Sequence, residues 1–203
     1  MTKRSYNLGQ RAFSQEETRR RIVDATVALH EEIGPRATTI SAIAEKANVQ
    51  RLTVYRHFPD EAELFKACTS HWFELNPPPR PSQWLQEEGM ARLHFALHQL
   101  YSYYRRTERM WSLAYRDEAE VPALVEPMRK VRAYLEAVQL DLSGHLDPKS
   151  PDNWALTLTI GSAIQFATWQ TLAREETNDD FLASIVCDWI RGVIGKQIAP
   201  QRD

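Results

Sequence analysis

The sequence predicts an all-α protein. Apolar residues recur at the three- and four-residue spacing of helices. Only seven of the 203 residues are glycine, and no stretch of alternating apolar and polar residues is long enough for a sheet. A chain that is 43% hydrophobic and 26% charged also has the composition of a globular protein with ample core.

The N-terminal end is predicted to hold a flexible basic arm followed by a long helix. Residues 1–13 carry three basic and no acidic side chains, so they are expected to form the arm or a disordered tail. The helix is predicted to begin at Ser14, because Ser14–Glu17 fits a capping box. Its buried stripe runs from Ile22 to Ile33, and Gly34-Pro35 ends it.

Two short helices are predicted next, within about residues 39–58, and their spacing is that of a helix-turn-helix. Thr38 or Thr39 can cap the first of them. That helix has one apolar face, made by Ile40, Ile43, Ala44 and Ala47. Asn48 follows at the turn, where a residue that tolerates positive φ is needed. Pro59 is expected to end the second helix.

The side chains expected to face outward from this pair suit contact with DNA. Arginine and glutamine read base edges, threonine and tyrosine hydroxyls reach phosphates, and leucine packs on a thymine methyl group. The predicted DNA-binding residues are Thr39, Gln50, Arg51, Leu52, Thr53, Tyr55, Arg56 and His57. An ordinary helical hairpin with a solvated polar face is the alternative. The charge distribution favours DNA, because residues 1–21 hold six basic and two acidic side chains although the whole chain has a net charge of −2.

Several short motifs closely resemble the DNA-binding domain of TetR-type (TetR/AcrR) transcriptional regulators. They are Thr38-Thr39, Ile43-Ala44, Ala47-Asn48-Val49, Thr53–Phe58 and Leu64-Phe65. The resemblance covers roughly Ser14–Cys68. It implies a bacterial homodimer with N-terminal domains that bind operator DNA and C-terminal domains that bind a small molecule.

The chain departs from the family pattern at three places. Asn48 stands where glycine is usual, and Gln50 and Leu52 stand where serine and a small residue are frequent. Glu61 stands where a basic residue is common, which removes one expected phosphate contact. The first change is expected to be harmless, and the second is expected to alter the preferred DNA sequence.

A proline-rich linker over residues 77–82 is predicted to divide the chain. Before it, Asp60 is expected to cap a fourth helix of about 15 residues, which completes a first domain over residues 14–76. The second domain covers residues 83–203, with Ser150 and Pro151 at the start of its uncharged helix. Its helices are expected over 82–106, 107–118, 128–144, 153–173 and 178–196, for a total of about nine.

Aromatic residues gather in the first part of the second domain, and small-molecule pockets are built from such walls. The predicted ligand-binding residues are Phe95, His98, Tyr101, Tyr104, Trp111 and Tyr115. Plain helical core is the alternative for any one of them, and Trp84 either joins them or only covers the linker. The basic residues Arg105, Arg106 and Arg109 are expected in solvent at a helix end. The expected ligand is therefore neutral or cationic and partly aromatic.

The last two helices are apolar around most of their circumference, which predicts burial on two sides. The resemblance implies a homodimer interface here. Its predicted members are Trp154, Leu158, Gly161, Gln165, Trp169, Ile185 and Trp189. A monomeric helical core would give the same pattern.

The remaining patterns argue against other classes of protein. His94 and His98 lie one turn apart without a convincing third ligand, so no metal site and no cofactor are expected. The sequence has no nucleophile elbow, phosphate loop or zinc-protease motif, so it is not predicted to be an enzyme. Cys68 and Cys187 fit a reducing cytoplasm, and neither a signal peptide nor a membrane span is predicted.

The predicted function is that of a repressor that a small molecule releases from its operator. The alternative is a helical small-molecule-binding protein or enzyme whose helix-turn-helix is vestigial.

Overall fold

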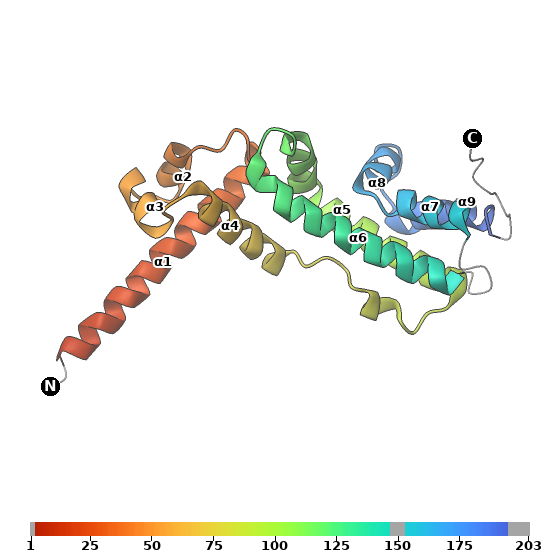
Figure 1. Cartoon of the computed structure of the whole chain (residues 1–203), viewed down its shortest axis with the longest axis horizontal. Helices are drawn as coiled ribbons and strands as arrows, with labels where there is room; N and C mark the ends of the chain where they lie inside the picture. The colour runs from red at the N-terminus through yellow and green to blue at the C-terminus, as the bar shows by residue number, and fades with distance from the viewer. Residues whose placement is uncertain (1–2, 147–152, 195–203) are drawn as a thin grey trace. The chain divides into compact units, whose positions relative to one another are not determined.

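The computed structural model describes residues 3–146 and 153–194, and within these ranges the chain is entirely helical, as predicted (Figure 1). The α-helices of the described ranges are α1 Lys3–Glu32, α2 Ile40–Lys46, α3 Arg51–His57, α4 Glu61–Leu75, α5 Gly89–Asp117, α6 Val125–Leu146, α7 Trp154–Ala163, α8 Phe166–Ala173 and α9 Asp179–Arg191. Two 3₁₀ turns, η1 Pro81–Trp84 and η2 Pro122–Leu124, lie between them. None of these helices is both long and apolar enough to cross a membrane.

The chain divides into two compact units. The first comprises Met1–Pro77 and Arg109–Pro127, and the second comprises Pro78–Glu108 and Met128–Asp203. The predicted linker over 77–82 contains the first crossing between the units. Residues 109–127 belong to the first unit, although the sequence suggested that they belong to the C-terminal domain.

The core of the first unit is a cluster of apolar side chains from α1 to α4. Its fully buried members include Ile22 of α1, Ile43 and Ala44 of α2, Val54 of α3 and Leu64 of α4. Ala44, as a small residue, lets α2 lie close to its neighbours. Helices α2 and α3 have only seven residues each, so they depend on burial of these side chains for their stability.

The turn between α2 and α3 has the geometry that the sequence predicts. The Thr39 hydroxyl oxygen accepts a hydrogen bond from the Ala42 amide at 3.2 Å and caps α2. Asn48 has φ of 52°, so it supplies the left-handed residue after the helix. The Val49 amide then donates to the Ala44 carbonyl at 2.9 Å and closes the turn. Asp60 caps α4 through the Glu63 amide at 2.7 Å, also as predicted.

The start of the first helix differs from the prediction. Helix α1 begins at Lys3 and not at Ser14, so residues 3–13, predicted to be a flexible arm, are helical. Ser14 therefore does not cap the helix, and its carbonyl accepts a hydrogen bond from the Thr18 hydroxyl at 2.8 Å. Nothing in Lys3–Phe13 breaks a helix except Gly9, because the segment contains no proline.

Helix α5 is one helix where two were predicted. The expected break at Thr107 is absent because no proline or glycine occurs between Met90 and Asp117, and the Thr107 hydroxyl donates to the Tyr103 carbonyl within the helix. The last nine residues of α5, Arg109–Asp117, lie in the first unit.

Two arginines of α5 cap the C-terminus of α1. Arg109 donates to the carbonyls of Glu31 and Glu32, and Arg116 Nη2 donates to the Ile33 carbonyl at 3.0 Å. Cations are stabilising at this end of a helix, where the last carbonyls lack partners. Gly34 follows with φ of 92°, and a Cβ there would lie 2.4 Å from Arg116 Nη2. The contact between Arg116 and the end of α1 therefore requires glycine at position 34.

Asp117 completes this contact as a buried carboxylate. It accepts a hydrogen bond from the Arg36 amide at 3.0 Å and forms an ion pair with Arg116 at 2.7 Å. The hydrogen bond from Arg116 is the main reason that the pKa of Asp117 lies below its usual value. The end of α5 is thus bonded to the turn that leads from α1 to α2.

The second unit is held together by the first part of α5 and by α6 to α9. Trp84 belongs to its core and does not merely cover the linker: it is fully buried, and its indole donates to Asp141 at 2.9 Å. Arg92 pairs with the same carboxylate at 2.7 Å. The ion pair joins α5 to α6, and the hydrogen bond from Trp84 holds η1 against α6.

The uncharged run at 153–173, predicted as one helix, forms α7 and α8 with a break at Ile164 and Gln165. The hydroxyls of Tyr101 and Tyr104 donate to the carbonyls of Ala163 and Ile164 at 2.9 and 2.8 Å. These buried hydroxyls satisfy carbonyls that the interrupted helix leaves unpaired. Asn153 caps α7, whereas the predicted Ser150 and Pro151 lie outside the described residues.

Two other boundaries also deviate. Helix α6 begins at Val125, because Pro127 is tolerated within its first turn. Helix α9 begins after the predicted Asn178 cap but ends at Arg191, and the predicted end near Lys196 lies outside the described residues. The cysteines Cys68 and Cys187 are both free thiols and buried.

The first unit contains a buried histidine that makes its stability depend on pH. Burial lowers the pKa of His30 from 6.5 to about 4, so the native ring is neutral where an unfolded one is charged. As pH falls from 6.5 towards 4, the unfolded state binds a proton that the native state does not. We therefore expect the wild type to lose roughly 2–3 kcal/mol more stability than His30→Asn between pH 7 and pH 4.5.

Urea unfolding at the two pH values measures this difference. His145→Asn is the matched control, because that side chain is about half exposed. Equal pH dependence in the wild type and His30→Asn would show that His30 is not buried as a neutral ring.

Candidate nucleic-acid interface

The face of α3 opposite the core carries the predicted DNA-binding residues. Val54 and Phe58 are buried, whereas Leu52 is 73% exposed and Tyr55 is 40% exposed. Gln50, Arg51 and Arg56 are also exposed, and Thr53 and His57 are half-buried. The structure therefore brings seven of the eight predicted residues together on one short helix and its cap, and the eighth, Thr39, is exposed at the start of α2.

The polar groups at the start of α3 are available for a ligand. Gln50 caps the helix with its backbone only, because its side chain makes no capping hydrogen bond. Among the described residues, neither Gln50 nor Arg51 has a side-chain hydrogen-bond or ion-pair partner. An amide and a guanidinium in this state can both read base edges.

The hydroxyl groups of Thr53 and Thr39 each accept one hydrogen bond within the protein and can still donate one to a ligand. The Thr53 hydroxyl oxygen accepts from Arg56 Nη2 at 3.3 Å, and the Thr39 hydroxyl oxygen accepts from the Ala42 amide. Each hydroxyl keeps its hydrogen for another acceptor, and a phosphate oxygen is such an acceptor.

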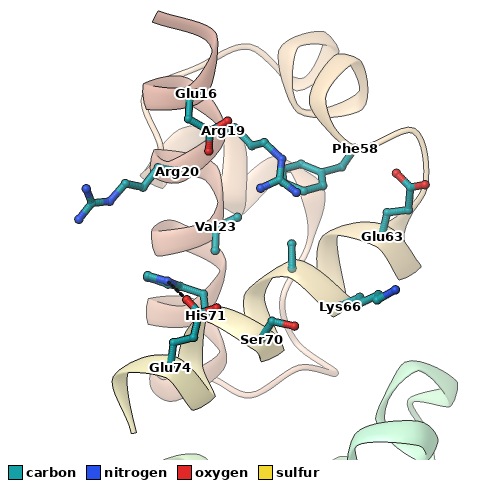
Figure 2. A pocket seen from close by; sticks show the side chains of 11 residues that line it. Glu16, Arg19, Arg20, Val23, Phe58, Glu63, Lys66, Ser70, His71 and Glu74 are labelled. Carbon is teal, nitrogen blue, oxygen red and sulfur yellow. Dashed lines mark ion pairs between the residues drawn. The ribbon is translucent and has the colours of Figure 1, made fainter. Parts of the chain in front are cut away.

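Basic residues of α1 add positive charge beside α3. The Arg19 guanidinium lies 4.7 Å from the centre of the Phe58 ring (Figure 2), and Arg21 donates to the Ala47 carbonyl at 3.4 Å. Burial is the first cause that lowers the pKa of His57, and the positive charges of Arg56 and Arg19 add to it. The positive potential therefore comes from the arginines, while His57 is held towards its neutral form.

Two cavities lie in the first unit. The larger, of about 670 Å³, is a groove between α1 and α4 with charges of both signs, including Glu16, Arg20, Lys66 and His71 (Figure 2). The smaller, of about 480 Å³, is mostly apolar and lies among α1, α2, α4 and η2. Sequence reasoning predicted neither cavity, because each is formed by residues from helices that are distant in the chain.

The six predicted ligand-binding residues do not lie together. Tyr101 and Tyr104 are buried in the second unit, where Tyr104 packs against Phe166 and Trp169. Phe95 and His98 are half-buried on the same helix. The other two lie in the first unit, where Trp111 packs edge-on against Trp72 at 5.7 Å and Tyr115 packs against Trp111.

The predicted interface residues also separate into two groups. Trp154, Leu158 and Trp189 are each about half exposed, and α7 and α9 lie in contact (Figure 1). Gly161, Gln165 and Ile185 are half-buried. Trp169, in contrast, is fully buried in the core, and its indole donates to Asp179 at 3.1 Å.

Two corrections concern the charged residues near these groups. Arg105 is half-buried and pairs with Asp179 at 2.7 Å, whereas Arg109 is exposed, as expected, but caps α1. Arg106 is exposed as well, with its guanidinium 4.8 Å from the centre of the Tyr103 ring. His94 bonds the Ser184 hydroxyl at 3.1 Å, and the described residues contain no cluster of three potential metal ligands.

Comparison with known proteins agrees with the geometry of the helix-turn-helix. Residues 22–68 match the family model of bacterial regulatory proteins of the tetR family. These residues thus carry a DNA-binding domain of the tetR type. The matched residues run from the core of α1 to Cys68 of α4, so they include the whole of α2 and α3.

Curated relatives resemble the same part of this chain. The transcriptional repressor KstR of Rhodococcus jostii is 40% identical over 73 residues, which cover 33% of this chain and 34% of the relative. The uncharacterized regulator YvkB of Bacillus subtilis is 45% identical over 53 residues, which cover 26% of this chain and 28% of YvkB. The chain thus matches about a third of the length of these curated relatives.

Solved structures resemble the fold of nearly the whole chain. A TetR-like transcriptional regulator from Rhodococcus sp. RHA1 has a TM-score of 0.61 at 20% identity, covering 88% of this chain and 97% of that one. A putative fatty acid metabolism regulator of Clostridium perfringens has a TM-score of 0.62 at 19% identity, covering 87% and 99%. At this identity the likeness concerns the fold alone.

The geometry of α3 predicts different effects for two substitutions on this helix. Arg51→Ala should cost about 1–3 kcal/mol on the preferred DNA and relax preference at one base position, because it removes a base contact. Tyr55→Phe should weaken binding to all sequences alike, because it removes a phosphate contact.

Fluorescence-anisotropy titrations on preferred and scrambled duplexes measure both effects. Arg174→Ala, which removes an exposed arginine of the second unit, is the control and should bind like the wild type. The assigned roles are wrong if Arg51→Ala leaves affinity unchanged while Tyr55→Phe abolishes the sequence preference.

Proposed function

We propose that this protein is a cytoplasmic, ligand-responsive transcriptional repressor that binds operator DNA as a homodimer. The observation that carries the proposal is the outward face of α3, where exposed Gln50 and Arg51 have no partner among the described residues. Packing of α3 against the core does not require these exposed polar side chains. The match of residues 22–68 to the tetR family model supports the same conclusion, as does the name of KstR, a repressor.

In this proposal two α3 helices enter successive major grooves, with half-site centres about 34 Å apart. A ligand lowers the affinity for the operator if it binds better to a conformation in which the two α3 helices are a different distance apart. The ligand thus acts without touching DNA.

The second unit is the proposed site of that ligand, beside Phe95 and His98 of α5, where Tyr101 and Tyr104 form the neighbouring core. A neutral or cationic, partly aromatic molecule fits better than an anion. Arg92 and Arg105, on the same part of α5, are already paired with Asp141 and Asp179. The tyrosine faces favour apolar rings and cations.

The homodimer is proposed to form through α7 and α9. These helices expose Trp154, Leu158, Phe181 and Trp189, each about half exposed, within one unit. Large apolar side chains gathered in this way are characteristic of an interface with a partner. Trp169 contributes to the core beneath them and not to the contact.

Replacement of Trp189 should therefore prevent assembly. Trp189→Glu would place a charge in the interface, and we expect a monomer in sedimentation velocity where the wild type is a dimer. Leu85→Glu is the matched control, because Leu85 is 58% exposed in the same unit but lies outside α7 and α9. Dimers of equal stability in both variants would locate the interface elsewhere.

Selection of binding sites from a random duplex pool tests the function itself. We expect the wild type to enrich a two-fold symmetric sequence, with an affinity that falls roughly tenfold or more between 50 and 200 mM salt. The double variant Arg51→Ala/Tyr55→Phe should enrich nothing. Absence of any enriched sequence with the wild type would favour the alternative, a ligand-binding protein or enzyme with a vestigial helix-turn-helix.

A further inference from the structure

The smaller cavity of the first unit has walls suited to an apolar molecule. Its volume of about 480 Å³ lies within the range of small-molecule sites. Ile40, Ile43, Leu64 and Phe65 form one side, and the residues of η2 form another. The cavity lies wholly in the first unit, so it is separate from the ligand site proposed in the second unit.

Two of the polar residues that line the cavity are already satisfied by their own backbone. The Thr26 hydroxyl donates to the Ile22 carbonyl, and the Thr38 hydroxyl donates to the Gly34 carbonyl, both at 2.8 Å. Their hydrogens are therefore not available to an occupant.

His30 is different. Its side chain is only 6% exposed and lines the cavity, and its Nδ1 lies 3.7 Å from the Cys68 sulfur. The described part of the chain offers Nε2 no hydrogen-bond partner. A ring nitrogen without a partner can accept a hydrogen bond from an occupant of the cavity.

The neighbours of His30 determine which group it can bind. The Cys68 thiol donates its one hydrogen to the Phe65 carbonyl at 3.1 Å, so its sulfur faces Nδ1 as an acceptor. Nδ1 then carries the ring proton, and Nε2 has the free lone pair. Burial keeps the pKa of His30 at about 4, so this neutral form persists at physiological pH.

The charge of the lining excludes an anion. Among the described residues that line the cavity, Glu61 is the one with a formal charge at neutral pH, and it is negative. A carboxylate or phosphate would meet this charge without a cation to offset it.

We propose that this cavity is a second small-molecule site, which binds a neutral, mainly apolar compound with one hydroxyl or N–H group that donates to His30 Nε2. The occupant contacts α1, α2 and α4, the helices that enclose the core beneath α3. Binding of the compound does not depend on DNA. The test therefore succeeds or fails independently of the repressor function.

Calorimetric titration of the full-length protein with 1-naphthol and 1-methoxynaphthalene tests the site. The two probes have the same ring system, but only 1-naphthol can donate a hydrogen bond. We expect 1-naphthol to bind about fivefold more tightly to the wild type, as one net hydrogen bond implies. In His30→Phe this difference should disappear. Failure of 1-naphthol to bind, or equal binding of both probes to the wild type, would overturn the proposal.

Substitutions that fill a cavity locate the bound probe. Ala62→Trp fills the proposed site and should weaken 1-naphthol binding by about tenfold or more, whereas Ala67→Trp on the same helix fills the other groove and should leave binding unchanged. Ala123→Trp fills the proposed site from its opposite wall and should act like Ala62→Trp, which guards against a folding defect in one variant. Unchanged binding in both filled variants, or equal loss in Ala67→Trp, would place the probe elsewhere and overturn the proposal.

Discussion

Burial of Val54 and Phe58 is the contact on which the interface depends. Helix α3 has only seven residues, and a helix of this length is unstable in water by itself. It persists because these two side chains are buried in the core of α1, α2 and α4, which turns the opposite face outward. The side chains of Gln50 and Arg51 take no part in this core and have no partner among the described residues, so their polar groups remain available for DNA.

The second constraint is the arginine contact at the end of α1. Arg109 and Arg116 bond the last carbonyls of α1, and Asp117 holds the following turn. As a result the chain passes between the units at three places, near Pro77, Glu108 and Pro127, and not at the proline-rich linker alone.

The sequence predicted the helix-turn-helix well because its signals are local. Asn48 at the turn and Asp60 at the cap each act on backbone within a few residues. Sequence reasoning failed where the local structure depends on contacts with residues distant in the chain. The break between α7 and α8 accompanies hydrogen bonds from two tyrosines of α5, and Trp111 finds its partner, Trp72, in the first unit. The cavity at His30 has no local signal at all, because four separate segments form its walls.

The central claim is that two copies of α3 read DNA in one dimer. Hydroxyl-radical footprinting of a selected duplex tests it most directly. We expect two patches of protection on one face of the DNA, with centres about one helical turn apart. A single protected patch, or uniform protection whatever the sequence of the duplex, would contradict it.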